Sequence, residues 1–234
     1  MPLACIVPTR LRWRPWLVHQ LDLLAPQLAA DDAIVIVCDC DTMPPEVFEQ
    51  AREQFGPRLT IVQLSYARAD VPDGCVNRAR RAGVAVTPLT HDVVEVDDHD
   101  PLERNALASI RTAFEAGADY VLSGRNRQQA IIEGPDRRLL LEVWPSFVSS
   151  YTPGAFARCE LEPIAPRAIR RSLWEKLGGW NDAWPQGDLA MAQRAEAIGA
   201  KIECLMVPLA TVTVDADSVS GQYRGQRPEP AEAG

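Results

Sequence analysis

The chain has 234 residues, which suits one large domain or one domain with small additions. Its formal net charge of −8 and sequence pI near 5.0 argue against broad binding to nucleic acid or anionic membranes, although they permit a local basic patch. No apolar run approaches the ~18 residues of a membrane span, and the N-terminus MPLACIVPTR lacks the basic and long apolar segments of a secretory signal. We therefore expect a cytoplasmic protein with no integral membrane segment.

Strands and helices are predicted to alternate through the first half of the chain. Short apolar runs predict strands, and apolar residues at helical spacing predict helices, the first of which begins near Pro15 and ends near Pro26. The predicted strands cover 3–7, 33–38, 59–64, 92–96 and 119–124, and the later helices cover 45–55, a segment from about 76, and 101–116. Continuous apolar strands between helices predict an α/β fold with a mostly parallel sheet covered on both faces.

The second half of the sequence is less regular. A strand is predicted at 137–143, a surface loop over 144–166, helices at 167–177 and 188–198, and closing strands in KIECLMV and LATVTV. The tail 219–234 is rich in proline, glycine and glutamate, and we predict that it is disordered. Residues 1–218 are expected to form a single domain.

The stretch 93–102, VVEVDDHDPL, places three aspartates and a histidine directly after a predicted buried strand. Close like charges raise one another's pKa unless something positive lies among them. In parallel sheets ligands bind at the carboxyl ends of the strands, and hard cations such as Mg²⁺ and Mn²⁺ prefer oxygen ligands and bridge phosphates. An acidic run alone more often forms a solvated turn, but this position favours a metal site that holds a nucleotide diphosphate.

Three further candidates each have a structural alternative. Asp39, at the end of the second predicted strand, could accept hydrogen bonds from a nucleobase or ribose, or cap a helix. Arg80 or Arg81 in NRARRAG could reach the nucleotide, or lie on the solvated face of a helix that Gly83 caps. Asp188, at a predicted helix start, could be a general base or an N-cap.

Six short motifs follow one another along the chain: IVPTR, IVIVCDCD, ARRAG, VEVDDHD, WEKLGGWND and GDLAMAQRAEAIG. In sequence and order they resemble the motifs of inverting family 2 glycosyltransferases, which have the Rossmann-like GT-A fold. ARRAG is similar to the A-R-N-x-G helix of that family, VEVDDHD to its D-x-D region, and the last two to its G-G-[FW]-[DN]-E segment and E-D helix. Each motif is weak alone, but six in order are specific, and they span roughly residues 3–215.

The resemblance implies roles for individual residues. Asp188 would match the aspartate of the E-D pair, the general base that deprotonates the acceptor hydroxyl. Residues 1–124 would form the half that binds the nucleotide sugar, and 125–218 the half that binds the acceptor. The implied donor-binding residues, around the nucleobase, ribose and diphosphate, are Pro8, Thr9, Arg10, Asp39, Arg80, Asp97 and Asp98.

The chain departs from the family pattern at three places. The acidic run has two possible registers, and we adopt the literal D-x-D pair, Asp98 and Asp100, as metal ligands because carboxylates suit Mg²⁺ or Mn²⁺. Gly187 replaces the glutamate that precedes the base. No histidine follows His99, so either His99 or a residue near Asp215 would complete the metal shell.

We therefore expect a hexosyltransferase-like enzyme that uses Mn²⁺ or Mg²⁺ to move a sugar from a nucleotide-diphosphate sugar to an acceptor hydroxyl. The alternative is a non-catalytic nucleotide- or sugar-binding domain that retains the fold, and a nucleotidyltransferase ranks third because PTRLRWRP has no glycine. The acceptor stays open between a saccharide, a protein, a small molecule and, ranked last, a nucleic acid. The arginine-rich segment 165–172 could recognise a phosphate on the acceptor, or begin a solvated helix.

Overall fold

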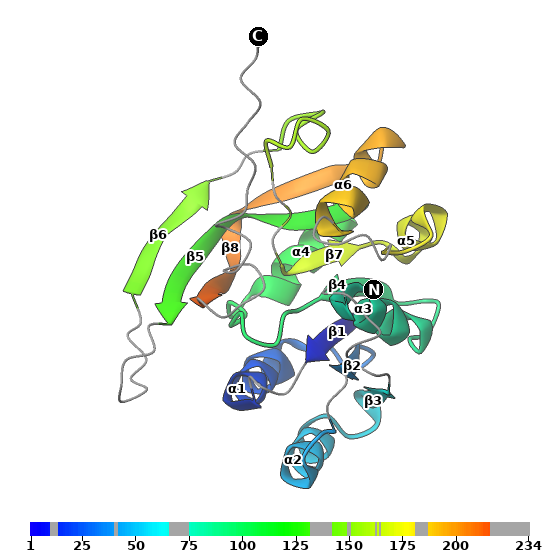
Figure 1. Cartoon of the computed structure of the whole chain (residues 1–234). Helices are drawn as coiled ribbons and strands as arrows, with labels where there is room; N and C mark the ends of the chain where they lie inside the picture. Colours follow the sequence, from blue (N-terminus) through cyan, green and yellow to red (C-terminus); the bar gives the residue numbers. More distant parts are fainter. Residues whose placement is uncertain are drawn as a thin grey trace.

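A mostly parallel sheet runs through the residues that the computed structural model describes, which are 1–9, 14–39, 42–65, 75–131, 142–148, 151–161, 163, 165–180 and 187–215. Within these ranges the sheet has eight strands in the order β3-β2-β1-β4-β7-β5-β6, and β8 pairs with β5 off this path (Figure 1). The strands are β1 (Leu3–Thr9), β2 (Ala33–Asp39), β3 (Leu59–Leu64), β4 (Asp92–Glu95), β5 (Tyr120–Ile131), β6 (Glu142–Val148), β7 (Arg167–Ile169) and β8 (Ile202–Asp215).

Most of these strands share one direction. β1 pairs in parallel with β2 and β4, and β2 pairs in parallel with β3. β7 runs antiparallel between β4 and β5, β6 is antiparallel to β5, and β8 is parallel to β5. Of the described strands, only β6 and β7 therefore oppose the common direction, which confirms the predicted sheet. The carboxyl ends of β1, β2 and β4 consequently lie at the same edge.

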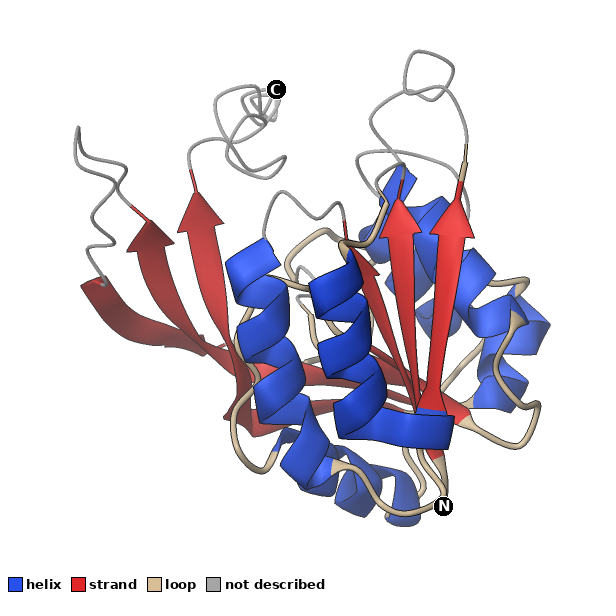
Figure 2. Cartoon of the chain, turned by 90° about the horizontal axis from the view of Figure 1, so that it is seen from below, coloured by secondary structure: helices blue, strands red, loops and turns tan. Residues whose placement is uncertain are grey.

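Helices cover both faces of this sheet (Figure 2). They are α1 (Arg14–Leu24), α2 (Pro45–Phe55), α3 (Cys75–Ala85), α4 (Ala106–Glu115), α5 (Arg171–Leu177) and α6 (Gly187–Ala197), with short turns of 3-10 helix at Ala25–Gln27 and Gly56–Arg58. Within the described ranges, none of the helices combines the length and the apolar character that crossing a membrane requires.

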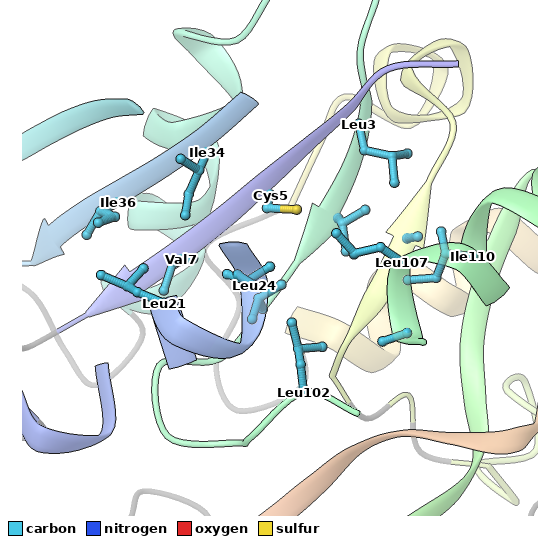
Figure 3. Packing of buried hydrophobic residues seen from close by; sticks show 14 of the residues in the cluster. Leu3, Cys5, Val7, Leu21, Leu24, Ile34, Ile36, Leu102, Leu107 and Ile110 are labelled. Atoms are coloured by element: carbon cyan, nitrogen blue, oxygen red, sulfur yellow. The ribbon is translucent and has the colours of Figure 1, made fainter. Parts of the chain in front are cut away.

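Alternate residues of β1 separate two hydrophobic cores. Leu3, Cys5 and Val7 pack with residues of α1, α2 and α4 (Figure 3), whereas Ala4 and Ile6 pack with residues of α3, α5 and α6. Successive side chains of a strand point to opposite faces of its sheet. A strand that is buried on both faces therefore needs an apolar residue at every position, which is why LACIV is an unbroken apolar run.

Gly83 allows α3 to approach the sheet closely. A Cβ atom at this position would lie 2.5 Å from Cγ2 of Ile6 and 3.0 Å from Cγ2 of Val37. Gly83 lies inside α3 and not beyond its end, so its predicted alternative role as a helix cap is wrong. Its missing side chain sets the position of the helix that carries Arg80.

Several element boundaries differ from the prediction. Residues 167–169 form β7, so the predicted helix 167–177 begins only at Arg171. Three residues are too few to show a strand period, and pairing with β4 and β5 decides their conformation. The predicted helix 101–116 begins at Ala106, because Leu102 pairs with Ala210 and the amide of Thr211 donates to the carbonyl of Pro101 (2.9 Å).

The remaining differences concern the second half of the chain. β6 occupies 142–148, part of which was predicted as loop, and β8 is one continuous strand where two were predicted. The helix predicted at 188–198 is confirmed as α6. Residues 137–141 of a predicted strand and the tail 219–234 lie outside the described residues.

Candidate functional site

Predicted site residues from different strands meet at the carboxyl edge of the sheet. β1 ends at Thr9 and β2 at Asp39, both with buried side chains, and Pro8 precedes Thr9 in the same strand. β4 lies on the other side of β1, and the acidic run that begins at Asp97 follows it. The fold therefore brings these positions together, whereas Arg10 lies outside the described residues.

The acidic run forms a turn whose carboxylates are buried. Asp98 and Asp100 are each 5% exposed, so the alternative of a solvated surface turn is wrong. Nδ1 of His99 lies 2.9 Å from Oδ1 of Asp98, and its Nε2 lies 3.9 Å from Oδ1 of Asp100. Burial alone would lower the pKa of His99, but the hydrogen bond to Asp98 and the charge of Asp100 raise it to about 10.

One oxygen of this turn is suited to a ligand. Oδ2 of Asp98 is buried and has no hydrogen-bond partner among the described residues, and such a group is unfavourable unless something pairs with it. No group of three or more histidine, cysteine, aspartate or glutamate side chains in the described ranges is arranged to hold a metal. Mg²⁺ often takes only one or two carboxylates and completes its shell with water and phosphate oxygens. Asp98 and Asp100 are therefore of the residue type and number that such an ion takes from a protein.

A network of charged side chains lies beside the acidic turn. Nη1 of Arg80 lies 2.7 Å from Oδ1 of Asp188, and its Nη2 contacts Glu95 and lies 3.5 Å from Oδ1 of Asp97. Nη1 of Arg167 lies 2.7 Å from Oδ2 of Asp188, while its Nε and Nη2 donate to Glu95. Arg80 therefore joins the start of the acidic run to Asp188 at the start of α6.

The two arginines hold Asp188 as a carboxylate. Burial alone would raise the pKa of Asp188, but Arg167 and Arg80 lower it below its usual value. Both oxygens are ion-paired, yet a carboxylate offers about four lone-pair sites, and the side chain is 33% exposed. Asp188 thus combines a fixed orientation with access for another molecule.

Glu95 balances the charge of the arginines from within the sheet. It is fully buried on β4, and burial raises its pKa to about 7 against the opposing effect of Arg167 and Arg80. The antiparallel register of β4 and β7 places Glu95 directly opposite Arg167. With Glu95 ionised, the two guanidinium charges are matched by Glu95 and Asp188.

Gly187 allows the start of α6 to approach α3. A Cβ atom at Gly187 would lie 1.9 Å from Nδ2 of Asn77, which is itself buried. Oδ1 of Asn77 accepts a hydrogen bond from Nη1 of Arg80 (3.0 Å). The glutamate that the family pattern has at position 187 would therefore collide with Asn77 and disturb Arg80.

The arginine-rich segment does not form a free basic patch. Arg167 belongs to the charged network, while Arg170 pairs through Nη1 with Oδ2 of Asp92 (2.9 Å) at the start of β4, the opposite edge of the sheet. Nη1 of Arg171 donates to Oγ1 of Thr87 (2.9 Å). These contacts do not support an acceptor-phosphate site, whereas α5 does begin within the segment, where Ser172 is exposed.

Sequence reasoning missed Glu95, Arg167 and Gln20, whose amide bonds to the backbone of the acidic turn. The one visible signal was Glu95 itself, because an acidic residue inside the apolar strand VVEV requires a buried partner. Its partner, Arg167, is 72 residues away. The pairing of β4 with β7 was needed to connect them.

Comparison with known proteins identifies the fold. No protein-family model and no curated protein matches the sequence. The crystal structure of S. aureus TarS 1-349 matches with a TM-score of 0.66 and 18% identity, over 91% of this chain and 60% of that chain. The mannosyltransferase PcManGT from Pyrobaculum calidifontis, in complex with GDP-Man and Mn²⁺, matches with a TM-score of 0.63 and 16% identity, over 90% of this chain and 56% of that one. The expected GT-A fold is thereby confirmed.

A differently named enzyme shares the arrangement. The 4-diphosphocytidyl-2C-methyl-D-erythritol synthase from Anaerococcus prevotii matches with a TM-score of 0.53 and 13% identity, over 96% of both chains. The fold alone therefore does not decide the reaction. The reaction depends on the side chains at the carboxyl edge of the sheet.

Proposed function

We propose that this chain is a metal-dependent inverting glycosyltransferase that moves a sugar from a nucleotide-diphosphate sugar to an acceptor hydroxyl. The observation that carries the proposal is the contact of Arg80 with both Asp97 and Asp188. It places an ionised, partly exposed carboxylate beside a turn in which a buried carboxylate oxygen has no hydrogen-bond partner within the described part of the chain. A donor held through its diphosphate at the turn would then lie next to a group that can accept a proton.

The solved neighbours support this choice of donor and metal. The crystal structure of TarS 1-349 was solved in complex with UDP-GlcNAc, and that of PcManGT is a complex with GDP-Man and Mn²⁺. In this chain, Asp98 and Asp100 would hold Mn²⁺ or Mg²⁺, which when bound would neutralise the charge that develops on the leaving diphosphate. Pro8, Thr9 and Asp39 would contact the nucleobase and ribose.

Asp188 is the proposed general base. Its carboxylate would take the proton of the acceptor hydroxyl while the acceptor oxygen bonds to the anomeric carbon and the bond from that carbon to the diphosphate oxygen breaks. Attack opposite the leaving group inverts the anomeric centre. Arg80 and Arg167 would orient Asp188 for this step, and a positioned base typically contributes about 10²–10⁴-fold in rate.

A non-catalytic nucleotide-binding domain is the second candidate. It is favoured by the same two arginines, because they lower the proton affinity of Asp188, whereas an efficient base has a pKa near the operating pH. Gly187 in place of a glutamate also favours it. A binding domain would take up the donor with metal but would neither transfer nor hydrolyse it.

A screen of nucleotide sugars with and without Mn²⁺ tests the proposal. We expect a thermal shift with one donor that depends on Mn²⁺, and release of the free nucleoside diphosphate when that donor is incubated with the protein. The anomeric configuration of the product, measured by NMR, should be opposite to that of the donor. A Mn²⁺-dependent thermal shift without turnover would favour the binding domain, and a product of retained configuration would contradict inversion.

A further inference from the structure

Gln20 connects α1 to the acidic turn. It is almost fully buried, with 1% of its surface exposed. Its Nε2 donates to the backbone carbonyl oxygens of Asp97 (3.0 Å) and Asp100 (2.8 Å), and its Oε1 accepts from the backbone amide of Leu102 (3.0 Å). The side chain of Gln20 therefore bonds to the backbone at the start of the turn, at Asp100 and just after the turn.

These three hydrogen bonds constrain the shape of the turn. The carbonyl groups of Asp97 and Asp100, with two residues between them, both accept from Nε2 of Gln20. This fixes the backbone that carries Asp98 and Asp100. Buried backbone polar groups are almost always paired, and losing a partner is unfavourable. Only an amide side chain offers both two donors and an acceptor for this purpose, so glutamate or leucine at this position could not replace Gln20.

The helix that carries Gln20 provides a fixed support. Leu17, Leu21 and Leu24 of α1 are buried in the core that α1 forms with α2, α4 and one face of the sheet. Gln20 is thus attached to packed structure, and its amide is not free to follow a moving turn. The turn is held from its far side as well, where Leu102 pairs with Ala210 of β8.

We propose that Gln20 is a positioning residue for the metal site, which fixes the turn 97–102 so that Asp98 and Asp100 present their carboxylates to one divalent cation. This inference rests on the proposed function for the identity of the ion. Residues that orient metal ligands without touching the metal typically change metal affinity by about 10–100-fold when they are replaced. We expect a loss in this range for Gln20→Leu.

Gln27 provides a matched control. Its Nε2 donates to the carbonyl of Leu23 (2.9 Å) and its Oε1 accepts from the amide of Leu107 (3.2 Å). Gln27, just after α1, therefore also bonds to backbone through its side chain, but to α1 and α4 and not to the acidic turn. Gln27→Leu removes two such bonds, so it should lower the melting temperature while leaving the turn intact.

The experiment compares the full-length parent, Gln20→Leu, Gln20→Glu and Gln27→Leu. Hydrogen exchange at the amide of Leu102 reports the turn directly, without any assumption about function. Titration with Mn²⁺, followed by electron paramagnetic resonance in the presence of UDP and separately of GDP, reports the metal site. We expect faster exchange at Leu102 in Gln20→Leu, which removes the acceptor of that amide. We expect about 10–100-fold weaker Mn²⁺ binding in Gln20→Leu and in Gln20→Glu, which lacks the donor of Nε2, but not in Gln27→Leu.

Each contrary result has a distinct meaning. Unchanged exchange at Leu102 in Gln20→Leu would overturn the claim that Gln20 fixes the turn. Faster exchange with unchanged Mn²⁺ affinity would overturn its role in metal binding. An equal loss of Mn²⁺ affinity in Gln27→Leu would show that general destabilisation causes the loss, which would overturn a specific role for Gln20. If the parent binds no Mn²⁺ with either nucleotide, the proposed function itself fails, and the metal-positioning role fails with it.

Discussion

Asp188 lies between two buried guanidinium groups, and this arrangement changes what its replacement should do. From the sequence it could be a helix cap, but both of its oxygens are ion-paired with Arg80 and Arg167. Removal of its charge leaves Arg167 paired with Glu95, and Arg80 with Glu95 and the more distant Asp97. Single residues at this site therefore contribute both to chemistry and to the stability of the network.

Asp188→Asn should lower transfer of sugar by about two to four orders of magnitude, because the amide cannot accept the proton. It should also lower the free energy of unfolding by about 1.5–3 kcal/mol, the range for hydrogen bonds to charged groups. Affinity for the donor with Mn²⁺ should change little. Initial rates of transfer, or of donor hydrolysis, measured beside chemical denaturation would check each part.

Asp92→Asn serves as the control for this substitution. Asp92 is also buried and paired with an arginine, but at the opposite edge of the sheet. Asp92→Asn should therefore lower the free energy of unfolding but leave the rate of sugar transfer unchanged. Full activity in Asp188→Asn would instead identify Asp188 as a structural residue.

Glu95→Gln should change the dependence of stability on pH. The pKa of Glu95 is raised from its usual 4.5 to about 7 in the folded state, so the folded protein binds a proton that the unfolded chain releases. Stability of the parent relative to Glu95→Gln should therefore fall as pH rises from about 4.5 to 7, and then level off. Denaturation curves of both proteins at several pH values would test this, and a constant difference between them would contradict it.

At the scale of elements, the contact between α3 and α6 depends on Gly187. Replacing a glycine in a helix with alanine normally stabilises the helix by about 0.5–1 kcal/mol. Here the added methyl group would meet Asn77 at 1.9 Å. The balance of these two effects is decided by how far the buried Asn77 can move.

Gly187→Ala should be destabilising, by about 1–3 kcal/mol as for other overpacked sites. Truncating the obstacle should relieve the strain, so the double variant Asn77→Ala/Gly187→Ala should be more stable than the sum of the two single changes predicts. Thermal denaturation of the parent, the two single variants and the double variant would measure this coupling as a double-mutant cycle. A stabilised Gly187→Ala variant would mean that the helices are not in close contact.

The elements also mark how far the sequence alone could predict this fold. The long apolar strands β1 and β2 and the helix α2 were predicted closely, because their patterns extend over a full period. β7 was predicted as helix, since residues 167–169 owe their conformation to β4 and β5 on either side. Asp98 and Asp100 were predicted as metal ligands from local pattern, which stays a prediction, whereas Gln20, Glu95 and Arg167 bond to partners 72 or more residues away.

At the scale of the whole molecule, the proposed function depends on one edge of the sheet. Parallel strands bring the ends of β1, β2 and β4 together, and α6 adds Asp188 to the same place through Arg80. The two hydrophobic cores hold this edge from both faces. The central claim is that the acidic turn at this edge binds a divalent cation and a nucleoside diphosphate together.

Calorimetric titration of UDP and GDP, with and without Mn²⁺, into the parent and Asp100→Ala tests this claim most directly. Glu103→Gln is the control, because Glu103 is an acidic residue just beyond the turn whose side chain is 3.4 Å from Thr211. We predict that Mn²⁺ strengthens binding of one nucleotide to the parent and to Glu103→Gln. Asp100→Ala should lose at least about 10-fold of this gain while it still unfolds in one cooperative transition. Mn²⁺-dependent affinity that is the same in Asp100→Ala as in the parent would contradict the account.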